Sequence, residues 1–98
     1  MDAKPLLRAF SELEDSILYE EEGPGLQAAR LRLILSLNQE IGKAATSDPT
    51  HAPWLKALQR RVNVVTVAVK MKSEENAKLA LKEATTSLRE LLDVLHAP

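Results

Sequence analysis

The 98-residue chain contains no cysteine, which excludes disulfide bonds, thiolate metal ligands and cysteine nucleophiles together. It also has no apolar run that approaches the roughly 20 residues needed to span a bilayer. The first residues are acidic and lack the apolar segment of a secretory signal peptide. These absences predict a soluble, cytoplasmic protein with no membrane segment.

Histidine and glycine, on which many small catalytic and phosphate-binding motifs depend, are scarce. The two histidines are expected in a loop (His51) and near a chain end (His96), so no serine or threonine has a placed histidine partner. Asp93 and His96 have a spacing found in metal sites, but no second pair supports them. No phosphate-binding loop surrounds any of the three glycines. We therefore expect no enzymatic activity, no metal site and no cofactor.

Charge is nearly balanced overall but unevenly distributed. The formal net charge is −1 and the isoelectric point about 6.1, which argues against a strongly basic nucleic-acid binder. Residues 1–22 hold seven acidic against two basic side chains, a local balance of −5. Residues 49–73 hold five basic side chains and no acidic one, a balance of +5. This split indicates two solvated faces or two complementary surfaces.

The first half of the chain predicts two helices. Pro5 suits a first helical position, and residues 5–22 carry an apolar seam with helical spacing (Leu6, Phe10, Leu13 and Ile17). The sequence Gly-Pro-Gly at 23–25 should end that helix in a tight turn. Residues 26–45 are apolar over more than half of the helical circumference, so we expect this second helix to be the central element. The prolines of residues 46–53 predict a loop.

Residues 54–97 contain neither glycine nor proline. The β-branched stretch 62–69 would suit a strand, but no other segment offers a partner strand. Helical spacing also places three of its valines on one core face with two earlier apolar residues. That predicted face comprises Trp54, Leu58, Val62, Val65 and Val69. Ser73 followed by two glutamates is typical of a helix N-cap, so a break near Ser73 is favoured over one long helix. Beyond it, residues 77–95 form another apolar seam.

The predicted fold is all-α: a single-domain antiparallel helical bundle over residues 1–98, most simply four helices up and down. The alternative is three helices with a long C-terminal helix, because the region near Ser73 lacks a glycine to turn the chain.

Two sets of residues remain after the core is assigned. Val64, Val67 and Met71 form a second apolar strip on the third predicted helix, which is either internal core or a self-association surface. Glu12, Asp15, Tyr19 and Glu22 place the only tyrosine on an acidic helix face, a composition that suits a basic partner.

These patterns predict a non-enzymatic helical protein-interaction module, such as an adaptor, chaperone or regulatory subunit, that acts through helix faces as a homodimer. Its protein partner is unknown. The alternative is a regulator that contacts nucleic acid through the basic third helix, with Lys56, Arg60, Arg61, Lys70 and Lys72 as the cations.

Overall fold

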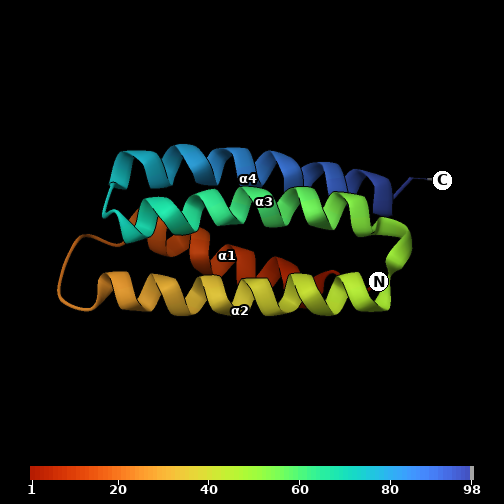
Figure 1. The fold of residues 1–98 in the computed structure, drawn as a ribbon, viewed down its shortest axis with the longest axis horizontal. Helices are drawn as coiled ribbons and strands as arrows, with labels where there is room; N and C mark the ends of the chain where they lie inside the picture. The colour runs from red at the N-terminus through yellow and green to blue at the C-terminus, as the bar shows by residue number, and fades with distance from the viewer. Residues whose placement is uncertain (98) are drawn as a thin grey trace.

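Four α-helices make up nearly all of the structure, a computed structural model that describes residues 1–97. In that range the elements are α1 (Lys4–Tyr19), α2 (Leu26–Ser47), the short 3-10 turn η1 (Pro49–His51), α3 (Ala52–Lys70) and α4 (Glu74–Leu95). Consecutive helices run antiparallel, and both ends of the chain lie at the same end of the bundle (Figure 1). The predicted all-α, four-helix architecture is confirmed, and the alternative with three helices is wrong.

Each helix contributes one buried stripe to a common core. The seams predicted for α1 and α4 are confirmed, since the residues of the α1 seam are buried and Leu95, the last of the α4 seam, is partly covered. The other residues of the α4 seam are buried: Ala77, Leu81, Ala84, Leu88 and Leu91. Contacts link α1 to α2, α2 to α3, α3 to α4 and, more sparsely, α4 back to α1. The four helices therefore form a ring around the core, in which each helix has two neighbours and one outward face.

The prediction that α2 is the central element is wrong. Only one stripe of α2 is fully buried, and Leu35 is 58% exposed. Leu31 and Leu33 lie at the flanks of this stripe and are partly covered by neighbouring helices. In a ring of four helices no member is surrounded, so the wide apolar surface of α2 serves two flanking contacts instead of a central position.

Residues 62–69 are helical, as predicted, but the core face of α3 differs at its first turn. Leu55 is fully buried, whereas Trp54 is half-buried and its ring lies 6.0 Å from the His51 ring. The 3-10 turn η1 leads directly into α3, so the indole packs at the corner where the chain enters the helix. The core position predicted for Trp54 therefore belongs to Leu55.

The turn between α3 and α4 forms without glycine. Lys72 adopts a left-handed backbone conformation with φ 56°, and its N–H donates to the carbonyl of Val69. The N–H of Ser73 donates to the carbonyl of Ala68, which completes a Schellman motif at the end of α3. The Ser73 hydroxyl then accepts from the N–H of Asn76, so the predicted N-cap of α4 is confirmed.

Replacing Lys72 with glycine should raise the free energy of unfolding by about 0.5–1 kcal/mol. The left-handed conformation costs a non-glycine residue about 1–2 kcal/mol, and the greater freedom of glycine in the unfolded chain offsets part of that gain. Urea denaturation of Lys72→Gly and of Lys72→Ala checks this, because alanine removes the same side chain but keeps the backbone strain. Equal stabilisation by both variants would contradict the backbone explanation.

Helix α1 ends earlier than predicted. Its last residue is Tyr19, and Glu20 has an extended backbone, so Glu20, Glu21 and Glu22 lie in the loop before Gly25. Carboxylates are unfavourable at the negative end of a helix dipole. The side chain of Arg30 also binds the carbonyl oxygens of Ser16 and Glu20, which stabilises the helix end at this point.

Candidate functional site

A shallow apolar hollow lies on the outer side of the α3–α4 pair. The predicted strip on α3 is exposed in the monomer: Val64 is 49% exposed, Val67 56% and Met71 68%. Leu79 of α4, which the sequence analysis missed, lies in the same hollow and is 57% exposed. The hollow has a volume of about 290 Å³, and Ala68, Asn76, Ala80 and Glu83 complete its lining. Within one chain, this strip is therefore a surface and not part of the core.

A second hollow continues the first along the same two helices, and Val64 and Glu83 line both. Its other lining residues are Ala57, Arg60, Arg61, Thr86, Ser87 and Glu90. Here cations come from α3 and carboxylates from α4, and one such pair, Arg61 with Glu83, is formed at 3.1 Å. We call the two hollows together the α3–α4 groove; it is apolar near the turn at Lys72 and charged farther from it.

The acidic set predicted for the first helix is only partly brought together. Glu12, Asp15 and Tyr19 are exposed and spaced so that they share one face of α1, and Tyr19 is 77% exposed. Glu22 lies in the loop beyond the helix, so its predicted place on this face is wrong. Because α1 adjoins α2 and α4, and α3 lies across the ring, this face and the α3–α4 groove are separate surfaces of one chain.

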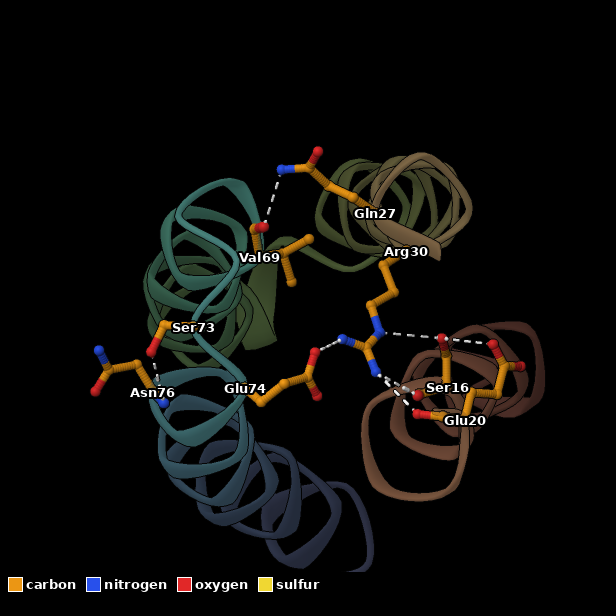
Figure 2. Close-up of polar contacts among 8 residues, drawn as sticks. All are labelled: Ser16, Glu20, Gln27, Arg30, Val69, Ser73, Glu74 and Asn76. Atoms are coloured by element: carbon orange, nitrogen blue, oxygen red, sulfur yellow. Dashed lines mark hydrogen bonds and ion pairs between the residues drawn. The ribbon is translucent and has the colours of Figure 1, made fainter. Parts of the chain in front are cut away.

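A buried arginine ties the ends of the helices together (Figure 2). The guanidinium of Arg30 lies between Glu74 at the start of α4 and the last turn of α1. Its Nε donates to the Ser16 hydroxyl at 3.4 Å, and its Nη2 donates to the Ser16 carbonyl at 2.8 Å. Its Nη1 pairs with a carboxylate oxygen of Glu74. One side chain of α2 thus fixes α1 against α4.

Gln27, one turn before Arg30, makes the corresponding contact to α3. Its side-chain amide donates to the carbonyls of Val69 and Lys70 at 3.2 and 3.1 Å, in the last turn of α3, where carbonyls lack a partner farther along the helix. The Val69 carbonyl also accepts from the N–H of Lys72. Every fully buried side-chain nitrogen and oxygen among residues 1–97 has a hydrogen-bond partner. This end of the bundle is therefore a satisfied polar network with a structural role.

Arg30 was not singled out from the sequence, although it lies in register with the buried stripe of α2, four residues before Ile34 and seven before Leu37. That spacing was the available signal, since a lone charge on an apolar helical stripe requires a buried partner.

His51 pairs with Asp48 at the opposite end of the bundle. The His51 Nδ1 lies 2.6 Å from a carboxylate oxygen of Asp48, and this hydrogen bond lowers the pKa of Asp48. The neighbouring Trp54 ring lies at an angle of 52° to the imidazole. This contact holds the entry to α3. His96, the other histidine, is exposed at the end of α4.

The structure brings no metal-binding group together within residues 1–97: no cluster there contains three or more histidine, aspartate or glutamate side chains placed to hold an ion. Over the same range, no helix combines the length and the apolar character that crossing a membrane requires. Comparisons with protein families, with curated proteins and with solved structures found no match to this chain.

Proposed function

We propose that the protein is a non-enzymatic helical protein-interaction module that self-associates through the α3–α4 groove. The observation that carries this proposal is that four large apolar side chains, each about half to two-thirds exposed, line one hollow. Single exposed apolar residues are ordinary, but a contiguous apolar hollow with a polar rim is typical of an interaction surface. The occupant we propose is a second copy of this chain.

The energetics require a partner surface that covers the whole hollow. Completing the burial of each half-covered valine, leucine or methionine contributes about 1 kcal/mol. With four such side chains from each of two copies the gain is about 8 kcal/mol, which lies within the roughly 4–15 kcal/mol that association costs. The apolar hollow alone therefore gives at most a weak dimer, and the flanking polar residues must contribute to a stable one.

Replacing Val67 with glutamate should raise the Kd of the homodimer at least tenfold and leave the monomer folded. A carboxylate in a closed apolar interface would be buried without a partner, whereas the same group on the free monomer stays hydrated. Sedimentation equilibrium over a dilution series measures the Kd, and circular dichroism melting reports the fold. Leu35→Glu is the matched control, because Leu35 of α2 has nearly the same exposed fraction as Val67 but lies outside the groove.

The proposed function fails if the wild-type chain stays monomeric throughout the dilution series. It also fails if Val67→Glu and Leu35→Glu leave the same Kd, since the groove would then take no part in association.

The acidic face of α1 supports a second interaction, with a basic partner. An exposed aromatic ring flanked by carboxylates combines a desolvated contact with electrostatic steering. This surface stays a prediction, as does the role of adaptor, chaperone or regulatory subunit. We place that role in the cytoplasm, because a chain without cysteine suits a reducing compartment.

The alternative function, nucleic-acid contact through α3, has no specific observation in its favour. Arg60 and Arg61 share their hollow with Glu83 and Glu90, and Arg61 is already paired. Phosphate binding requires cations that are free of nearby carboxylates. We therefore do not carry this alternative further.

A further inference from the structure

We infer that the second copy binds about a two-fold axis parallel to the helices, so that α3 of each copy lies on α4 of the other. This inference rests on the proposed function and adds to it the symmetry of the dimer and the residues that face each other. Three features of the chain carry it: the area of the α3–α4 face, the charge of each helix and the order of residues along the groove.

The area of the face requires the whole groove to take part. A stable interface buries about 800 Å² on each partner. The Cα trace measures 44 by 20 by 19 Å, so one long face offers about 900 Å² when 44 Å is multiplied by 20 Å. The apolar hollow occupies only the part of that face near the turn at Lys72. A dimer of sufficient area must therefore also cover the charged hollow around Arg60 and Glu90.

The charges of the two helices select the pairing. Helix α3 has four basic residues and no acidic one, whereas α4 has five acidic and three basic residues, a net charge of −2. Two arrangements place the α3–α4 faces together with two-fold symmetry and aligned helices. An axis perpendicular to the helices puts α3 of one copy on α3 of the other, so two helices whose charged side chains are all positive face each other. A parallel axis puts α3 on the more acidic α4, where opposite charges meet.

The order of residues along the groove fits the parallel axis as well. Helices α3 and α4 run antiparallel from the short turn at 71–73, so positions on the two helices lie opposite each other, at the same level, when they are equally far from that turn. This places Met71 opposite about Asn76, Val67 opposite about Leu79 and Arg60 opposite about Ser87, and these residues line the two hollows. A parallel two-fold axis preserves these levels between copies. Val67 therefore meets Leu79 of the other copy, and the apolar half of the groove meets an apolar half. A perpendicular axis through the groove centre would reverse the levels and press Arg60 and Arg61 onto Val67.

The parallel axis also brings Arg60 within reach of Glu90 of the second copy. Within one chain, Arg61 pairs with Glu83, although Glu83 lies about three residues along α4 from the position opposite Arg61. That distance is about 4.5 Å along the helix axis. Arg60 and Glu90 have an offset of the same size in the opposite direction. Among the described residues neither of them is part of an ion pair. Each dimer would therefore contain two Arg60–Glu90 pairs, related by the axis.

Charge reversal tests this pairing with two variants of the full chain. Arg60→Glu places two carboxylates against each other twice per dimer, and Glu90→Arg does the same with two cations. We expect each variant alone to raise the Kd of the homodimer about tenfold or more. An equimolar mixture should recover dimers, because every contact between the two different variants again joins opposite charges. Native mass spectrometry identifies the mixed dimer by its mass, and sedimentation equilibrium measures its Kd.

Arg32→Glu on the exposed side of α2 is the control for the effect of net charge, and we expect it to leave the Kd unchanged. The pairing of α3 with α4 is overturned if both groove variants dimerise like the wild type. It is equally overturned if they are monomeric and their mixture stays monomeric. In either case a loss of the dimer in Val67→Glu would still support self-association through the groove, so the two proposals fail separately.

Discussion

Replacing Arg30 with alanine should lower the free energy of unfolding by about 3 kcal/mol, although a lone arginine seldom matters to a small bundle. Removing one partner of a buried ion pair costs about 3–5 kcal/mol, because the other partner and its neighbours lose their compensation. Glu74 keeps about a third of its side chain in solvent, which reduces that penalty. The carbonyl of Ser16 also loses its side-chain donor, and the cavity left by the stem adds to the loss.

Chemical denaturation in urea measures this effect, with two controls. Arg32→Ala removes an exposed arginine from the same helix and should change the free energy of unfolding by less than about 0.5 kcal/mol. Arg30→Lys keeps the charge but loses the forked geometry that serves four acceptor atoms on Ser16, Glu20 and Glu74, so we expect an intermediate cost of about 1–2 kcal/mol. If Arg30→Ala were as stable as Arg32→Ala, the network at this end would not stabilise the fold.

Replacing Leu55 with alanine should cost about 3 kcal/mol of unfolding free energy. Leu55 is fully buried in the first turns of α3, and truncating a buried leucine loses transfer free energy and leaves a cavity, at a cost of about 2–5 kcal/mol. The middle of that range applies here because the helix can shift slightly where η1 leads into it. Thermal and urea unfolding give the value, and Leu35→Ala, at an exposed position, is the control.

The Leu55→Ala variant also tests whether Leu55, as in the structure, or Trp54, as predicted from the sequence, occupies the core position. The structure predicts that Leu55→Ala destabilises the protein more than Leu35→Ala by at least about 2 kcal/mol. A loss equal to that of Leu35→Ala would mean that Leu55 is not packed in the core. Trp54→Leu should be tolerated better than Leu55→Ala, since the indole is half exposed at the corner.

Helical periodicity was sufficient to predict the order and the approximate bounds of the helices. The seam of α1, the helical character of 62–69 and the cap at Ser73 depend on spacing and local chemistry, which a sequence displays directly. The end of α1 was placed three residues too late because its position depends on Arg30, a side chain that lies 10 residues beyond Glu20. Local patterns do not contain that contact.

The errors at α2, Leu79 and Arg30 share one cause, which is the number of neighbours that each helix has. An apolar position on α2 or α3 can face a neighbouring helix or solvent, and the sequence does not say which. Leu35 and Leu79 are exposed because the ring of four helices leaves one outward face on each. Arg30 is buried because α1, α2 and α4 meet at one point. For the same reason, the sequence did not decide whether the strip at Val64, Val67 and Met71 is core or a self-association surface.

The link between Arg30 and Glu74 has a consequence for how the chain is made. The two residues are 44 positions apart, so a ribosome has synthesised both α1 and α2 well before the carboxylate leaves the exit tunnel. An α1–α2 hairpin that formed before then would hold the Arg30 guanidinium near the carbonyls of α1 but without its counter-charge. The last helix therefore supplies both the remaining wall of the core and the charge that neutralises Arg30. We expect Arg30 to gain that counter-charge only when α4 docks on the other helices.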